Sequence, residues 1–189
     1  MPQSHDPDQL QNLIQRLDNI HPDPRMHDDA NGLICCRLAL DALEQGNYGV
    51  AAVLISPMGE VVAQAENRVF SHGYNSAAHA EMLLLDLLEQ ETIGYAPAQL
   101  TMLVSLEPCP MCMTRLLLSG IGTVRYMTKD ADGGMLTHLD KLPPAWRNLA
   151  QLQNHYPAHL SDSIRELAAE LAGMNLVHLR HKLFIHIRP

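Results

Sequence analysis

Three residues in the middle of the chain have the types and spacing of zinc ligands. His79 stands upstream of the segment Pro108-Cys109-Pro110-Met111-Cys112. Imidazole and thiolate are the usual zinc donors, and three protein ligands leave the fourth tetrahedral position open for water. A structural zinc site needs a fourth protein donor. The ligands His79, Cys109 and Cys112 therefore predict a catalytic site with one Zn²⁺ per chain and a bound water or hydroxide.

A carboxylate two residues after the histidine, Glu81, has the chemistry of a proton carrier. Zinc lowers the pKa of a bound water from about 15.7 to near 7, so hydroxide forms at neutral pH. Glu81 can accept the proton of this water and pass it to a departing group. In a regular helix Glu81 and His79 would point to different sides, so we expect His79 in an irregular first turn. Glu81 is thus the predicted catalytic residue.

The competing hypothesis is a closed, structural zinc site in a non-enzymatic interaction domain. Cys35, Cys36 or His72 could complete such a site. The cysteine pair falls on an apolar helix face, where cysteine behaves as a small hydrophobe, and His72 lies in a polar loop. A purely structural site also has no need of Glu81, so this hypothesis is the less favoured.

Composition limits the classes of partner. The formal net charge of this 189-residue chain is −8, whereas nucleic-acid-binding proteins normally show a basic patch. A nucleic-acid partner is therefore less favoured, and Arg180-His181-Lys182 with Arg188 is the one candidate basic segment. No apolar stretch approaches the roughly 18 residues of a membrane span, and residues 1–6 show no signal-peptide pattern. Four cysteines, two of them ligands, predict a cytoplasmic protein without a disulfide framework.

Hydrophobic periodicity and turn residues predict the elements that must position these side chains. Helices are expected at 7–20, 28–44, 79–90, 110–119 and 161–172. Strands are expected at 48–56, 60–66, 100–106 and 123–128, the first two as a hairpin. Residues 175–187 alternate as in a strand, with a helix as the alternative. This alternation of strands and helices predicts an α/β fold, with helices covering a central sheet.

Two of the predicted helices begin at the metal ligands. Cys109 should lie at the start of the 110–119 helix, since proline is favoured as a first helical residue. The positive end of the helix dipole lowers thiol pKa values there. Cys112 follows one turn later on the same side, and His79 begins the other helix. Two helix N-termini are therefore expected to converge on one cation.

The motif formed by His79-Ala80-Glu81 and Pro108-Cys109-Pro110-Met111-Cys112 resembles that of the cytidine and deoxycytidylate deaminase superfamily. Residues 48–54 are similar to its first hairpin strand, and Glu107 matches its Glu-Pro-Cys form. The resemblance is closest to the branch with bacterial tRNA adenosine deaminases, guanine deaminases and yeast-type cytosine deaminase. It implies zinc-dependent hydrolytic deamination of a nucleobase or nucleoside with release of ammonia. It also implies a three-layer α/β/α sandwich around a roughly five-stranded mixed sheet and, usually, a homodimer.

The resemblance divides the chain into three parts. Residues 1–27 are expected to form an N-terminal helical extension, and residues 28–135 the zinc-dependent deaminase core. Residues 136–189, a helix plus a possible strand, are expected to complete the same domain. The C-terminal third follows no family pattern, so specificity residues within it are not predicted.

The resemblance also implies substrate contacts. Asn67 would hydrogen-bond the substrate, and the backbone at Ala78 would meet the base. Asp132 stands where guanine deaminases place an acid, and one carboxylate can accept both the N1–H and the N2–H₂ of guanine. A turn acid beside two glycines is the alternative for Asp132. Free guanine is the favoured substrate, with adenosine in tRNA or cytosine and cytidine as alternatives.

Overall fold

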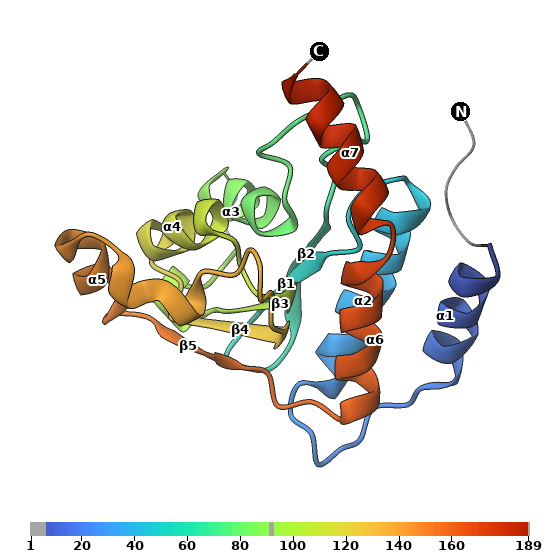
Figure 1. Cartoon of the computed structure of the whole chain (residues 1–189). Coiled ribbons are helices and arrows are strands. Elements are labelled where there is room, and N and C mark those ends of the chain that lie inside the picture. The colour runs from blue at the N-terminus through green and yellow to red at the C-terminus, as the bar shows by residue number, and fades with distance from the viewer. Residues whose placement is uncertain (1–6, 91–92, 189) are drawn as a thin grey trace.

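The computed structural model describes residues 7–90 and 93–188 (Figure 1). Residues 1–6, on which the signal-peptide inference rests, lie outside the described residues. The α-helices are α1 (Pro7–Asn19), α2 (Asp29–Glu44), α3 (Ala80–Gln90), α4 (Pro110–Ser119), α5 (Pro144–Ala150), α6 (Asp162–Gly173) and α7 (Leu176–Ile187). The strands are β1 (Ala51–Ile55), β2 (Val61–Glu66), β3 (Thr101–Leu106), β4 (Thr123–Thr128) and β5 (Asn154–Pro157). Two short 3₁₀ helices are η1 (Pro97–Gln99) and η2 (Leu136–Lys141).

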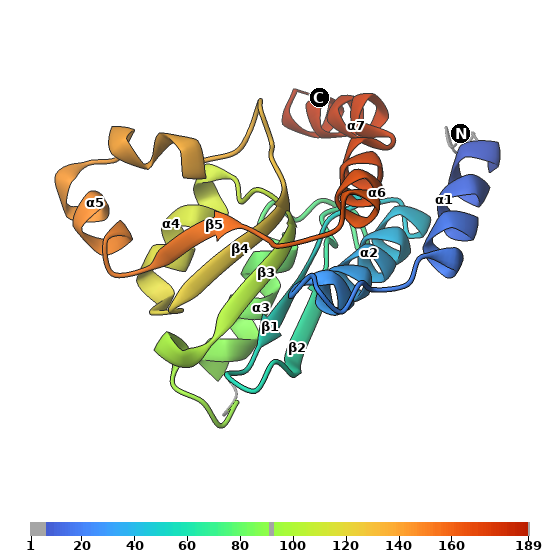
Figure 2. The same ribbon diagram turned by 90° about the horizontal axis from the view of Figure 1, so that it is seen from below.

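The five strands form one mixed sheet in the order β2-β1-β3-β4-β5. β1 pairs antiparallel with both β2 and β3, whereas β3, β4 and β5 run parallel. Helices α2 and α6 cover one face of the sheet, and α3 and α4 cover the other (Figures 1 and 2). This confirms the predicted α/β/α sandwich around a five-stranded mixed sheet.

Strand β1 shows why the sheet has two covered faces. All five of its residues are buried, and successive side chains of a strand point to opposite faces. Ala51, Val53 and Ile55 join the core beneath α2 and α6. Ala52 and Leu54 join the core beneath α3 and α4. A strand buried on both sides therefore has an uninterrupted apolar sequence.

The strand predicted at residues 175–187 is wrong, because this segment is helix α7. Its alternating Val177, Ile185 and Ile187 are exposed, so their spacing does not mark a buried strand face. The fifth strand is instead β5, a short and largely polar segment at the edge of the sheet. Neither β5 nor α5 was predicted. Across residues 7–90 and 93–188, every helix is too short or too polar to cross a membrane.

Candidate metal centre and active-site pocket

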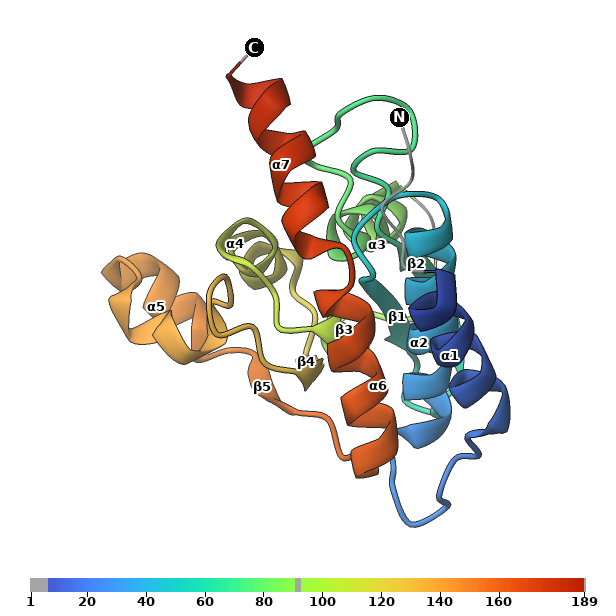
Figure 3. The same cartoon turned by 45° about the vertical axis from the view of Figure 1, so that its right-hand side comes forward.

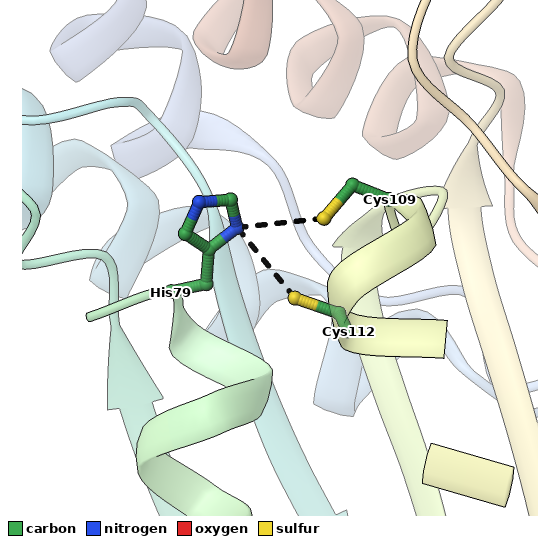
Figure 4. A group of neighbouring side chains, drawn as sticks. All are labelled: His79, Cys109 and Cys112. Carbon is green, nitrogen blue, oxygen red and sulfur yellow. Dashed lines mark hydrogen bonds between the residues drawn. The ribbon is translucent and has the colours of Figure 1, made fainter. Parts of the chain in front are cut away.

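The predicted metal ligands meet at the N-termini of two helices (Figure 4). His79 immediately precedes α3, and its carbonyl accepts the N–H of Leu83 at 3.0 Å. Cys109 is the N-cap residue of α4, and Cys112 lies in the first turn of that helix. His79 therefore occupies the helix entrance that the sequence requires if His79 and Glu81 are to face one site.

The distances between these side chains fit a shared tetrahedral metal ion. His79 Nδ1 lies 3.9 Å from Cys109 Sγ and 3.6 Å from Cys112 Sγ. All three ligand atoms lie within 4.8 Å of one another. Two ligands of one tetrahedral zinc, with ordinary Zn–N and Zn–S bonds, are about 3.6 Å apart. The side chains thus fit zinc without rearrangement.

The other cysteines do not complete a closed site. Among the described residues, the cluster that could hold a metal contains His79, Cys109 and Cys112 alone. Cys35 and Cys36 are fully buried in the core beneath α2 and α6. Burial raises the pKa of the Cys36 thiol to about 12 and also raises that of Cys35. The site therefore offers three protein donors and leaves room for a water molecule.

The electrostatic environment suits a metal and a proton carrier. The hydrogen bond from Cys112 lowers the pKa of Cys109 to about 4 against the effect of burial, and the hydrogen bond from His79 adds to the lowering, which favours the Cys109 thiolate. The same pairing and burial raise the pKa of the Cys112 thiol. Burial raises the pKa of Glu81, and the neighbouring His79 partly opposes this. Within the described part of the chain, Glu81 Oε2 is buried without a hydrogen-bond partner. A buried carboxylate oxygen normally has one, so Glu81 Oε2 offers an unused acceptor beside the metal ligands.

A cavity of about 500 Å³ opens beside the metal ligands. Asn67 in its wall is 2% exposed, and its Oδ1 accepts the N–H of Val69 at 3.2 Å, which fixes the amide. Helix α7, which lies outside the metal-binding motif in the sequence, supplies part of the wall. The residues that line the cavity include Tyr48, Asn67, His79, Glu81, Leu106, Glu107, Cys109, Asp130, Gly133, Ala172, Leu176, Arg180 and Leu183.

Two predicted substrate contacts do not line this cavity. The Ala78 N–H donates to Asn75, and its carbonyl accepts the N–H of Arg68. The Asp132 side chain is 79% exposed, with Oδ2 4.0 Å from Arg180 Nη2. The acid of this loop that does line the cavity is Asp130. Contact of Ala78 or Asp132 with the substrate stays a prediction.

A buried glutamate holds the loop between β4 and η2 against the site. Glu107 is 3% exposed. Its Oε1 accepts the N–H groups of Leu136 at 2.9 Å and Thr137 at 3.3 Å. Its Oε2 accepts the N–H of Asp130 at 3.2 Å. The residue before Pro108 therefore positions a wall of the cavity.

Several wall residues were missed in the sequence. Leu176, Arg180 and Leu183 of α7 are spaced four and three residues apart, which places them on one helical face. The sequence shows this helical spacing, but the alternation of Val177, Ile185 and Ile187 in the same segment favoured a strand. Asp130 carries no signal of its own, because acids in glycine-rich turns are common.

The fold brings together one imidazole and two thiols, the donor set that would hold a single zinc ion. The family model of the cytidine and deoxycytidylate deaminase zinc-binding region matches residues 27–128. The chain belongs to this family.

Relatives agree with this assignment. The chain is 36% identical over 96 residues to the tRNA-specific adenosine deaminase of Bacillus subtilis (strain 168), covering 51% of this chain but only 58% of that relative. It is 30% identical over 152 residues to the tRNA-specific adenosine deaminase of Aquifex aeolicus (strain VF5), covering 79% of this chain and 94% of that protein. The structure of guanine deaminase from Nitrosomonas europaea matches with a TM-score of 0.57 at 22% identity, covering 85% of this chain and 92% of the other. This last likeness shows the fold.

Proposed function

We propose that the protein is a zinc-dependent aminohydrolase that removes the amino group of a nucleobase. The observation that carries the proposal is the buried Glu81 carboxylate, whose Oε2 lacks a partner among the described residues beside an imidazole and two cysteines. A structural metal site gains nothing from burying a carboxylate in this way. A hydrolytic site does, because Glu81 must exchange protons with water and substrate.

The side chains divide the chemistry among them. His79, Cys109 and Cys112 would hold Zn²⁺, which when bound supplies the Lewis acidity that lowers the pKa of water. Glu81 orients the attacking water at Oε2 and accepts its proton. It passes this proton to the ring nitrogen, then accepts the remaining proton of the added oxygen and passes it to the amino group, so that the C–N bond breaks, a carbonyl forms and ammonia leaves. The fixed Asn67 amide orients the base by hydrogen bonding from Nδ2.

Adenosine in tRNA is the substrate that we now favour. The two curated relatives described above are tRNA-specific adenosine deaminases, and one of them aligns over most of its length. The acid on which the guanine hypothesis rests, Asp132, is 79% exposed and does not line the cavity. The net charge of −8 disfavoured a nucleic-acid substrate, but helix α7 provides a local basic segment. Residues 176–188 contain Arg180, Lys182 and Arg188 and no acidic residue.

Free guanine is the second candidate. The carboxylate of Asp130 lines the cavity and could accept two adjacent N–H donors of guanine, as was predicted for Asp132. A cytosine or cytidine substrate remains the third alternative.

We also propose that the protein is a homodimer in the cytoplasm. We further propose that the chain divides into three parts, with boundaries after residues 27 and 135.

The test is ammonia release by the zinc-loaded protein with a tRNA anticodon stem-loop, guanine, adenine, cytosine and their nucleosides. We expect turnover of the stem-loop. Glu81→Ala should retain one zinc per chain and lose turnover, because it removes the proton carrier and no ligand. Cys109→Ala should lose both metal and turnover. Measurable deamination by Glu81→Ala, or silence of the zinc-loaded wild type across the panel, would contradict the proposal.

A further inference from the structure

Helix α7 brings a charged side chain over the metal centre. α6 ends at Gly173, and Asn175, with φ of 57°, turns the chain into α7. Figures 1 and 3 show α7 continuing beyond α6 beside the loop between β2 and α3. Lys182 lies over the Phe70 ring of that loop at 4.2 Å, and the Tyr74 and His186 rings are 4.1 Å apart. These contacts hold α7 with one face toward the cavity.

Arg180 lies at the centre of that face, between Leu176 and Leu183. It is the one lysine or arginine among the residues that line the cavity. Burial raises the pKa of the Tyr48 hydroxyl in the same wall, and the charge of Arg180 opposes this effect. The positive charge of the Arg180 guanidinium therefore acts on a group in the wall of the cavity.

The Arg180 guanidinium is only weakly paired. Within residues 7–90 and 93–188, the carboxylate oxygen nearest to it is Asp132 Oδ2, at 4.0 Å, and the Arg180 and Asp132 side chains are 50% and 79% exposed. This separation is too long for a hydrogen bond, and exposed ion pairs contribute little. The planar fork of N–H donors is thus available to a ligand, and its geometry matches a phosphate group.

A smaller hollow continues from the cavity at Arg180. The two share Leu106, Asp130, Ala172, Leu176 and Arg180, and the smaller one adds Lys129. Asp130 brings a carboxylate to the same place, but its Oδ1 already accepts two backbone N–H groups, from Asp132 and Gly133. The hollow therefore combines two cations, Lys129 and Arg180, with the engaged Asp130 carboxylate, and the Asp132 carboxylate 4.0 Å from Arg180 is 79% exposed. The N–H donors of Arg180 and Lys129 are what this hollow offers to an anion.

We propose that Arg180 is a specificity-determining residue that binds a phosphate group of the substrate, with Lys129 as the second cation beside it. This inference rests on the proposed function and narrows it. The reacting base enters the cavity toward Glu81, and the phosphate attached to its nucleoside contacts α7. A free base carries no such group, so the enzyme selects a nucleotide, either alone or within an RNA chain.

The experiment measures binding, so that it stands apart from turnover. Zinc-loaded Glu81→Ala protein is titrated by calorimetry with adenosine and adenosine 5′-monophosphate, with guanosine and its monophosphate, and with an anticodon stem-loop. We expect Arg180→Gln in this background to weaken binding of a phosphate-bearing ligand by about 10- to 100-fold, the effect of losing a charge-assisted hydrogen bond. Nucleoside binding should stay within twofold.

The matched control is Arg188→Gln, which removes a positive charge at the C-cap of the same helix, outside the cavity wall. It should leave monophosphate binding within twofold. Loss restricted to the monophosphates identifies a mononucleotide ligand. Loss restricted to the stem-loop, with a salt slope of log K reduced by about 0.7 to 0.9, identifies an RNA backbone phosphate.

Two results would overturn the inference. In one, Arg180→Gln weakens nucleoside and phosphate-bearing ligands equally, which makes Arg180 a wall residue only. In the other, the substitution changes neither. Absence of ammonia release by the wild type would count against the proposed function instead, while the binding comparison would still decide the role of Arg180.

Discussion

Removal of the Glu107 carboxylate should loosen the loop that forms one wall of the active-site cavity. Glu107→Ala deprives the backbone N–H groups of Asp130, Leu136 and Thr137 of their acceptor. Glu107→Gln keeps one carbonyl oxygen for Leu136 and Thr137 but turns an amide donor toward the Asp130 N–H. The glutamine variant should therefore lose less stability than the alanine variant.

The magnitude follows from the three distances. The 2.9 Å bond to Leu136 is charge-assisted and contributes about 1.5 to 3 kcal/mol, and the two longer bonds contribute about 0.5 to 1.5 kcal/mol each. Glu107→Ala should thus lower the free energy of unfolding by about 2.5 to 6 kcal/mol. For a chain of this size that corresponds to a fall in Tm of roughly 10 °C.

Urea unfolding of the zinc-loaded variants measures this loss, and amide hydrogen exchange locates it. Protection should fall at Asp130, Leu136 and Thr137 first, with turnover reduced because Asp130 and Gly133 line the cavity. A Glu107→Ala variant within about 1 kcal/mol of the wild type, or with unchanged protection at these amides, would refute the proposed role of Glu107.

Two further predictions concern the core. A Cβ at Gly49 would collide with the backbone carbonyl of Leu171, so Gly49→Ala should cost about 1 to 3 kcal/mol in urea unfolding; Gly173→Ala, where a Cβ meets open space, is the control and should be neutral or stabilising. Cys35 and Cys36 are 0% exposed, and the Cys36 pKa of about 12 leaves about one thiolate in ten thousand at pH 8. In a Cys109→Ala, Cys112→Ala background, which removes the two thiols of the metal centre, neither Cys35 nor Cys36 should react with a chromogenic disulfide at that pH before unfolding. A fast reaction of this variant in the native state would contradict their burial.

The metal centre was predictable because its geometry is local. His79 and Glu81 are neighbours in sequence, as are Cys109 and Cys112, and each pair begins a helix whose hydrophobic spacing marks its start. Once two such helices cover the same face of a sheet, their N-termini can share one ion. The buried strands β1 and β3 were predictable for a similar reason, since a strand enclosed on both faces must be apolar along its length.

The sequence by itself therefore determined the ligands of the metal, the proton carrier expected beside them and the sandwich that positions both. Only the tertiary structure decided which side chains close the cavity. Packing between segments far apart in the chain decides that one face of α7 lines the cavity, that β5 forms the edge strand and that Asp132 lies outside the cavity wall. Local periodicity contains no information about such contacts. In α7 it predicted a strand instead of a helix, because the exposed residues Val177, Ile185 and Ile187 have the alternating spacing of a strand.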